Sequence, residues 1–261
     1  MFIGREQRYH PGRSKLEATY ISLLGMPIIG LRIRARNVFS IIPQDREYHN
    51  ILDAGSGTGV FSFELARRFP HARVLGADPS KEKVAACGDI AKKIRASNIA
   101  FLKASIDHIR KENAFDLILC VDILEHIEDD IAALTKLFTI AAPGGVFVMH
   151  VPALYRRYPV WKKSPNFNVE THVRTGYEPR EIQNKVRDVG FSILSSGFTY
   201  GFWETLANNI SYMITHAKMK NKGLYSLAFP VLNGISLLGA RARPQKLGAG
   251  VFVVAKKRGK N

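Results

Sequence analysis

Between residues 51 and 151, short apolar runs alternate with amphipathic segments of ten or more residues. Short apolar runs are typical of buried strands, whereas apolar residues that repeat every three or four positions are typical of helices. The predicted strands are 51–54, 73–78, 99–104, 116–121 and 146–151, and the predicted helices are 60–69, 81–96 and 130–142. Strands joined through helices form right-handed βαβ units, which build a parallel sheet covered on both faces. The alternation therefore predicts a doubly wound α/β fold.

Two further apolar runs, 191–195 and 250–255, bring the number of predicted strands to seven, in a mostly parallel sheet. A long apolar insertion separates these two runs, and a helical stretch precedes the first strand. We therefore divide the chain into four parts: an N-terminal helical extension (1–48), a core (49–197), an apolar helical insertion (198–248), and the last strand with a basic tail (249–261).

The turn after the first predicted strand reads ILDAGSGTG, with Asp53 before a loop of Gly55, Ser56, Gly57 and Gly59. In a dinucleotide fingerprint no acid precedes the first glycine, because a pyrophosphate must meet bare backbone N–H groups at a helix start. Asp53 would repel that anion and instead suits a ligand that carries an ammonium group. Glycines without Cβ let the ligand lie against the turn. The turn therefore predicts a site for an amino-acid group.

The second predicted strand ends at Asp78, which precedes Pro79 and lies 23 residues after Gly55. A carboxylate at this place can accept hydrogen bonds from both hydroxyls of a ribose. The turn and the carboxylate together predict a nucleoside that bears an amino acid. Taken singly, each glycine is explained by the turn alone, and Asp78 is explained as a helix N-cap.

The glycine motif and the segment FDLILCVDILEHIED resemble those of class I S-adenosylmethionine-dependent methyltransferases, particularly the small-molecule and quinone-type branch. The resemblance spans about residues 51–191 and implies a Rossmann-like methyltransferase fold with S-adenosylmethionine as the cofactor. It implies that Asp53 and the glycine loop face the methionine end, and that Asp78 with Pro79 holds the ribose. Val121 and Asp122 are also expected at the cofactor.

The segment FLKASID resembles the adenine-binding turn of the same family. Many relatives carry Asp at the position of Ala104. The resemblance therefore leaves adenine recognition to Ser105, Ile106 or Asp107.

Three polar side chains, Asp122, Glu125 and His126, follow the fourth predicted strand. If this segment is a helical turn, their i, i+3 and i+4 spacing places them on one face. Such a set could bind a divalent metal that polarises an acceptor hydroxyl, and quinone-pathway O-methyltransferases have a similar cluster. Alternatively, His126 is a general base, with Glu125 as a second catalytic candidate. The remaining interpretation is that these side chains pack or cap beneath the cofactor.

The segment after the fifth strand contains His172, Arg174 and Tyr177, which match an HxRxxY-like pattern of many relatives. By that resemblance the loop borders the acceptor. His172 is therefore a third catalytic candidate, with a hydrogen-bonded loop anchor as the alternative.

Thirty-eight Lys and Arg against 22 Asp and Glu give a formal charge of +16, which attracts polyanions such as nucleic acid or an acidic membrane. Cys87 and Cys120 lie in apolar segments and are predicted to be buried, reduced thiols. The amino terminus lacks the layout of a secretory signal. We therefore expect a cytoplasmic protein that can sit peripherally at the inner face of a membrane.

Two apolar appendages support that expectation. Residues 223–240 of the insertion carry no charge, and Lys218, Lys220, Lys222, Arg241, Arg243 and Lys246 flank them. We expect a helical hairpin that lies on an anionic membrane together with the apolar N-terminal helix, in which Pro27 kinks or starts a second helix. The alternative is a soluble lid and a dimer interface.

The function expected from these features is methyl transfer to a small hydrophobic acceptor, such as a quinone, a polyprenyl compound or a lipid, near a membrane. An RNA methyltransferase is the rival, favoured by the basic charge and the aromatic residues. Against it, the fourth strand ends in CVDI instead of the Asn/Asp-Pro-Pro-aromatic motif of many enzymes that methylate base amines. A third alternative is a non-catalytic cofactor-binding adaptor.

Overall fold

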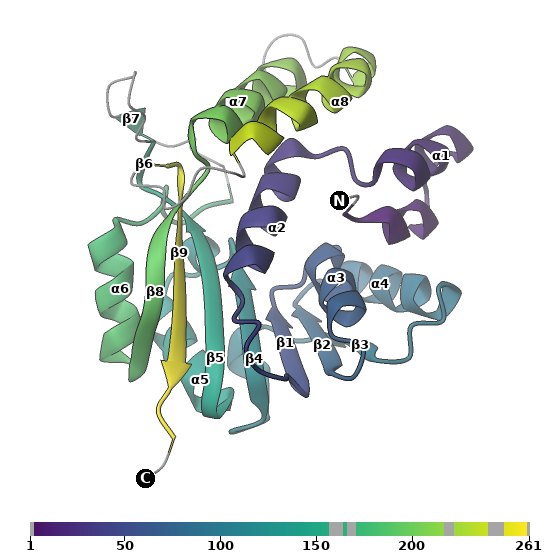
Figure 1. Ribbon diagram of the computed structural model, residues 1–261. Coiled ribbons are helices and arrows are strands. Elements are labelled where there is room, and N and C mark those ends of the chain that lie inside the picture. The colour runs from purple at the N-terminus through teal and green to yellow at the C-terminus, as the bar shows by residue number, and fades with distance from the viewer. Residues whose placement is uncertain (1–2, 157–163, 166–170, 217–221, 240–247, 260–261) are drawn as a thin grey trace.

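The computed structural model describes residues 3–156, 164–165, 171–216, 222–239 and 248–259. Its centre is a seven-stranded sheet with the order β3-β2-β1-β4-β5-β9-β8 (Figure 1). The strands are β1 (Asn50–Ala54), β2 (Arg73–Asp78), β3 (Ile99–Lys103), β4 (Phe115–Val121), β5 (Ala141–Pro152), β8 (Phe191–Thr199) and β9 (Gly250–Lys257). The first five run parallel, whereas β9 is antiparallel to both of its neighbours. The mostly parallel seven-stranded sheet is thus confirmed.

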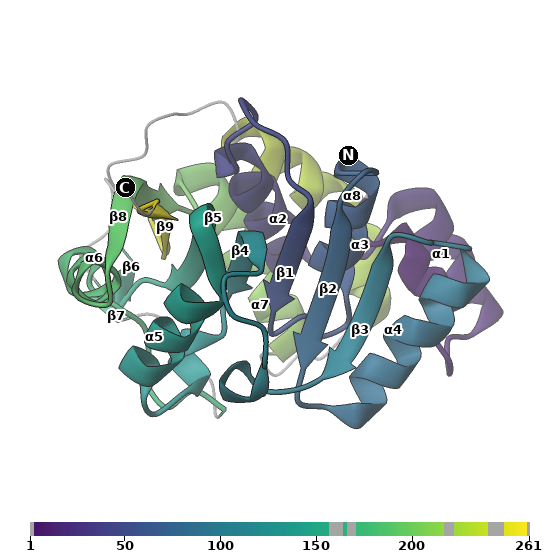
Figure 2. The same cartoon turned by 90° about the horizontal axis from the view of Figure 1, so that it is seen from below.

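Helices cover both faces of the sheet, and Figure 2 shows α2 and α5 on opposite sides of it. The helices are α1 (Lys15–Leu24), α2 (Ile29–Ile41), α3 (Val60–Arg68), α4 (Lys81–Lys93), α5 (Asp130–Ile140), α6 (Pro179–Asp188), α7 (Phe202–His216) and α8 (Lys222–Gly239). Three short 3-10 helices, η1 (Arg5–Tyr9), η2 (Ile106–His108) and η3 (Leu124–His126), and the small strands β6 (Tyr155–Arg156) and β7 (Ser164–Pro165) complete the described elements.

Strand β4 shows why the sheet needs two cores. Leu117 and Leu119 pack with α2 and α3, whereas Ile118 and Cys120 pack with α5 and α6. All four side chains are buried, because successive residues of a strand point to opposite faces. A parallel strand covered on both faces therefore reads as one continuous apolar run. Cys87 and Cys120 are both buried free thiols, as predicted.

Several element ends differ from the predictions. β5 starts at Ala141 instead of 146, and β8 continues to Thr199 instead of ending at 195. Both extensions come from pairing with a neighbour, since Ala141 pairs with Phe115 and Thr199 pairs with Gly250. Hydrogen bonding between strands far apart in sequence leaves little local signal.

The two apolar appendages pack against each other. The insertion forms a helical hairpin of α7 and α8, and the chain breaks between α1 and α2 around Pro27, as expected. The Tyr20 hydroxyl donates to the Ser226 carbonyl at 2.7 Å, and the Ile29 N–H donates to the Tyr225 hydroxyl at 3.3 Å. Ile33 of α2 and Phe229 of α8 share one buried apolar cluster.

By length and composition, Lys15–Ile41 could cross a membrane. In the structure this segment is two helices, and α2 buries Ile33, Val38 and Phe39 inside the protein. Of the basic residues that flank α8 in sequence, Lys218, Lys220, Arg241, Arg243 and Lys246 lie outside the described residues.

Candidate active site at the carboxyl edge of the sheet

A cavity of about 630 Å³ lies beside the carboxyl ends of β1, β2 and β4. The glycine turn, the end of β2, the start of η2 and the segment after β4 line it, and α2 adds Leu31 and Arg34. Ligands of open α/β sheets bind at this edge, and the volume suits a small molecule or cofactor.

The glycine turn presents backbone and an unsatisfied hydroxyl to this cavity. Gly55 and Gly57 have φ angles of +80° and +54°, which L-residues with a side chain rarely adopt. A Cβ on Gly55 would overlap the side chain of Ile123, whereas a Cβ on Gly57 would meet no atom within 4 Å. The buried Ser56 Oγ has no hydrogen-bond partner among the described residues. Gly57 and Ser56 therefore offer a polar ligand both space and a hydrogen bond.

Asp78 lines the cavity next to this turn. Its carboxylate accepts hydrogen bonds from the N–H groups of Gly57 and Ser80, both at 2.9 Å. A carboxylate has about four lone-pair sites, so both oxygens can still accept from a ligand. The helix N-cap of α4 is Ser80, which accepts from the Lys83 N–H. The N-cap interpretation of Asp78 is therefore wrong, and its geometry fits a ribose diol.

Asp53 lies elsewhere than expected. It does not line the cavity; its side chain is buried beneath the turn and accepts a hydrogen bond from the Ser62 hydroxyl at 2.5 Å. Gly59 is also outside the lining, and a Cβ there would meet Cys87 and Phe63. The predicted direct contact of Asp53 and Gly59 with the cofactor is corrected accordingly: both residues shape the turn from below.

Burial raises the pKa of Asp53 to about 6. The hydrogen bond from Ser62 lowers this pKa, but burial has the larger effect. A raised pKa means that the folded state prefers the proton, so the stability from Asp53 is full below about pH 4 and is lost as the pH rises through about 6. We expect Asp53→Asn to raise the free energy of unfolding at pH 8 by up to about 3 kcal/mol relative to the parent protein, and to have little effect at pH 4. Urea unfolding at both pH values measures this; an equal change at both would contradict it.

At the predicted adenine turn, Ser105 and Ile106 line the cavity, as does Pro79 at the end of β2. Asp107 does not: its side chain is exposed and pairs with His108 at 2.8 Å. The prediction for Asp107 is therefore wrong, because the 3-10 helix η2 directs it to solvent.

Val121 and Asp122 line the cavity. The Asp122 carboxylate is held there by interactions with other side chains of the protein. It forms an ion pair with Arg34 of α2 and hydrogen bonds to His150 Nδ1 at 2.5 Å, while His150 Nε2 bonds to the Thr199 hydroxyl at 2.7 Å. Burial would raise the pKa of Asp122, but Arg34 and His150 outweigh it and hold the pKa well below its usual range.

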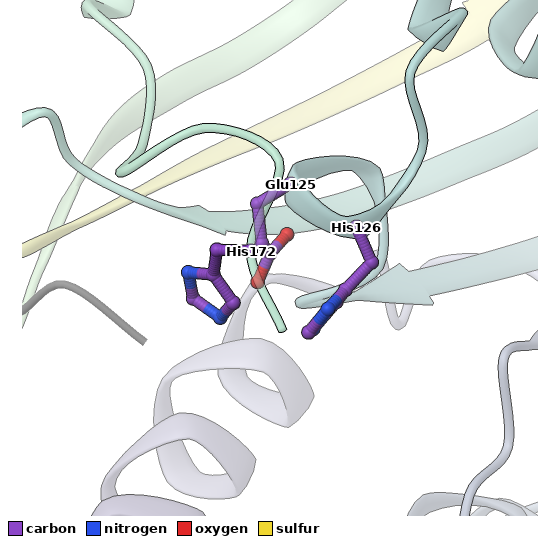
Figure 3. Close-up of side chains that lie close together, drawn as sticks. All are labelled: Glu125, His126 and His172. Carbon is purple, nitrogen blue, oxygen red and sulfur yellow. The ribbon is translucent and has the colours of Figure 1, made fainter. Parts of the chain in front are cut away.

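The predicted set of Asp122, Glu125 and His126 is thus not formed. Asp122 has a φ of +50°, and Glu125 and His126 lie on a 3-10 helix, so the helical face assumed from the spacing does not exist. Instead, Glu125, His126 and His172 come together, with their ligand atoms all within 4.8 Å of one another (Figure 3). His126 lines the cavity, while Glu125 and His172 lie behind it.

The three members of this cluster have different surroundings. Glu125 is fully buried, and neither carboxyl oxygen has a partner among the described residues. Burial and the nearby charge of Asp122 raise its pKa to about 9. His126 Nδ1 lies 2.9 Å from the Thr171 carbonyl, which can only accept, so in the neutral ring Nδ1 carries the proton and Nε2 is the free acceptor. Burial also lowers the pKa of His172.

A family model for a methyltransferase domain matches residues 45–190, more than half of the chain. The chain belongs to this methyltransferase family. A trans-aconitate 2-methyltransferase of Deinococcus radiodurans is 35% identical over 119 residues, 46% of this chain and 43% of the relative. A ubiquinone biosynthesis O-methyltransferase of Acinetobacter baumannii (strain AYE) is 24% identical over 185 residues, 64% of this chain and 76% of the relative.

Among solved structures, phosphoethanolamine N-methyltransferase 2 of Haemonchus contortus, in complex with S-adenosyl-L-methionine, has the same fold, with a TM-score of 0.60 at 14% identity. That alignment covers 86% of this chain and 52% of the Haemonchus contortus chain. The match to the trans-aconitate relatives spans less than half of their own length.

The chain thus has a methyltransferase domain, and its cavity has features that fit S-adenosylmethionine. The Asp78 carboxylate can accept hydrogen bonds from the ribose hydroxyls, and Gly57 leaves space for the ligand at the turn. The buried Ser56 hydroxyl has no hydrogen-bond partner among the described residues and can bond to the ligand. When bound, the cofactor supplies a methyl group on a positively charged sulfur, which is already an activated leaving group.

The loop that carries His172 is anchored by its other two motif residues. Arg174 donates to Asp130 at 2.9 Å and to the Leu124 carbonyl at 3.0 Å, and the Tyr177 hydroxyl bonds to the same carboxylate at 2.8 Å. Arg174 and Tyr177 thus fasten the loop to η3, which bears Glu125 and His126. His172 makes no such contact through Nδ1, which is buried without a hydrogen-bond partner among the described residues.

Sequence reasoning missed several residues of the site, among them Leu31, Arg34, His150 and Thr171. Two of them carried a signal. Arg34 stands in an apolar helix and His150 in the apolar strand FVMHVP, and a charged or polar residue in such a place usually has a buried partner.

The pair of Arg34 and Asp122 predicts a measurable coupling. Replacing Arg34 by Met leaves the Asp122 charge with His150 alone, so we expect a loss of about 3 kcal/mol in the free energy of unfolding. Asp122→Asn in the same background should cost less than it does alone, with a coupling energy of about 1–3 kcal/mol. Denaturant unfolding of the four proteins measures it; two effects that add within about 0.5 kcal/mol would show that the ion pair contributes nothing.

Proposed function

We propose that this enzyme transfers the methyl group of S-adenosylmethionine to a small hydrophobic acceptor, such as a quinone, a polyprenyl compound or another lipid, at or near a membrane. The observation that carries the proposal is the apolar part of the cavity lining. The lining includes the apolar side chains of Leu31, Phe61, Ile123 and Ile127, together with His126. Apolar side chains beside a histidine suit an apolar molecule with a reactive hydroxyl. The name of the ubiquinone biosynthesis relative agrees with this acceptor class.

His126 is the residue placed to handle the proton of the acceptor. An acceptor oxygen would attack the methyl carbon, the bond from carbon to sulfur would break with its electron pair going to sulfur, and the hydroxyl proton would pass to His126 Nε2. The products are the methylated acceptor and S-adenosylhomocysteine. Thr171 supports this role because its carbonyl fixes the proton on Nδ1.

The cluster also offers a set of ligands for a divalent cation. One carboxylate and two imidazoles suit Mn²⁺, Fe²⁺ or Zn²⁺, and the unpartnered oxygens of Glu125 fit such an ion. Metal analysis after incubation with Mn²⁺ and Zn²⁺ and gel filtration tests this. We expect one ion per chain in the parent protein and in Glu128→Gln, an exposed control, and none in Glu125→Gln. A metal-free parent protein would leave His126 as a base alone.

The acceptor class is tested with methyl-labelled cofactor and two separate extracts of cells, one of lipids and one of RNA. The proposal predicts label in the lipid fraction. Label in RNA alone would establish the rival activity, and label in neither, from protein that still binds S-adenosylhomocysteine, would support a non-catalytic adaptor.

A further inference from the structure

Helix α8 is apolar on all sides. No charged residue occurs between Gly223 and Gly239. Tyr225, Phe229, Leu232 and Ser236, spaced three or four residues apart, face the protein interior and α2. A helix that is apolar all round is normally buried on every side, yet α8 has a second apolar face that the described residues leave open to solvent.

That second face follows the helix repeat. Leu227 is 80% exposed, Val231 is 65% exposed and Leu238 is 54% exposed, at spacings of four and seven residues. Helix α1 shows the same arrangement, with Leu16 80% and Leu23 65% exposed, seven residues and thus about two turns apart. Both helices therefore present an apolar stripe to solvent.

Exposed apolar side chains concentrate in this part of the molecule. Of the sixteen large ones among the described residues, eleven lie on α1, α7 and α8 or just before α2. The remaining five are scattered over the core domain and include Ile94, Ile131 and Leu194. Scattered apolar residues are normal on a protein surface, whereas a concentration of this kind marks an interaction site.

The sequence that adjoins these stripes is rich in basic residues. Arg13 and Lys15 lie at or just before the start of α1, Arg5 lies in the neighbouring η1, and Glu17 is the one acidic residue of α1. The sequence on either side of α8 carries six Lys and Arg, from Lys218 to Lys246, as part of the excess of +16. Apolar stripes with basic flanks complement a bilayer of anionic lipids, because the lipid offers apolar chains beneath negative headgroups.

The position of the stripes relates them to the active site. Figure 1 shows α1, α7 and α8 beyond the carboxyl ends of the parallel strands, at the same end of the molecule as the cavity. Helix α2 joins the two places, since Leu31 lines the cavity while Ile29 and Ile33 pack in the cluster with α8. A membrane in contact with the stripes would therefore lie next to the active-site end.

We propose that the exposed faces of α1 and α8 form a docking surface for an anionic membrane, with the active-site end of the enzyme turned to the bilayer. An amphiphilic acceptor then reaches the cavity without crossing water. Only this last step rests on the proposed function; the docking itself requires no acceptor.

Flotation with vesicles tests the surface. Full-length protein is mixed at low salt with vesicles of phosphatidylglycerol and phosphatidylcholine, or of phosphatidylcholine alone. A variant with Leu23→Ser, Leu227→Ser and Val231→Ser removes three exposed apolar side chains from the stripes. A matched control with Ile94→Ser, Ile131→Ser and Leu194→Ser removes three from the scattered set.

We expect the parent protein and the control to float with the anionic vesicles at low salt. Both should bind more weakly to neutral vesicles, and both should bind the anionic vesicles more weakly at high salt. The stripe variant should partition at least about tenfold less, because each lost side chain removes buried apolar area. Binding of S-adenosylhomocysteine, measured on every sample, should be unchanged and shows that the variants fold.

Three results would overturn the docking surface. The first is a parent protein that stays at the bottom of the gradient, and the second is equal loss of flotation in the stripe variant and the control. The third is self-association of the parent protein in lipid-free buffer that the stripe variant abolishes, since a second copy of the chain would then cover the stripes. Failure of the proposed acceptor class would instead appear in the labelling experiment, with flotation unaffected.

Discussion

Replacing Asp78 by Ala should weaken the binding of S-adenosylhomocysteine at least about 100-fold. A hydrogen bond to a charged group contributes about 1.5–3 kcal/mol, and two ribose hydroxyls are expected on this carboxylate. A loss of about 3 kcal/mol corresponds to more than a 100-fold change in the dissociation constant. The substitution also frees the Gly57 N–H that Asp78 holds at 2.9 Å, which loosens the turn. Isothermal titration calorimetry measures the loss directly.

The matched control is Asp78→Asn, which keeps the size of the side chain and one oxygen acceptor. Its binding should fall between that of the parent protein and that of Asp78→Ala. Thermal unfolding of both variants separates lost binding from a lost fold. Unchanged affinity in folded Asp78→Ala protein would show that the nucleoside does not bind through this carboxylate.

Replacing His126 by Ala should lower the rate of methyl transfer by about 100- to 10,000-fold, the range of a general base. The affinity for S-adenosylhomocysteine should change little, because Asp78, Gly57 and Ser56 carry the expected cofactor contacts. The rate is measured as label transferred from methyl-labelled cofactor to the lipid extract in a given time.

An exposed histidine at the opposite end of the sheet provides the control. His71 lies just before β2, and His71→Ala should transfer label at the parental rate. Equal rates for His126→Ala and the parent protein would remove both the base and the metal role from His126, and positioning of the acceptor beside the sulfonium would then account for the reaction.

The parts of the fold that could be predicted depend on local signals. The β/α alternation, the glycine turn and the break at Pro27 are all encoded within a few residues of one another, and the structure has each of them. The ends of β5 and β8 could not be predicted, because pairing with distant strands sets them.

The candidate site shows the same division. Asp78 follows a strand at a fixed distance from the turn, so its place at the cavity could be foreseen. The spacing of Asp122, Glu125 and His126 was misleading. Asp122 has a positive φ, and Glu125 and His126 lie on a 3-10 helix, so the three residues do not share one face of an α-helix. The ion pair of Asp122 with Arg34, 88 residues away, leaves no local pattern.

Asp53 illustrates a further limit. A carboxylate beside a glycine turn is as consistent with a buried hydrogen bond as with a ligand contact. Only the position of the Ser62 hydroxyl, in the first turn of α3 and 2.5 Å from the carboxylate, distinguishes the two.

A crystal structure of the complex with S-adenosylhomocysteine tests the account most directly. We predict the ribose hydroxyls within hydrogen-bond distance of Asp78, the Ser56 hydroxyl bonded to the ligand or to a water held by it, and the sulfur facing the side of the cavity that His126 lines. A nucleoside bound away from Asp78, or a sulfur directed away from His126, would contradict it.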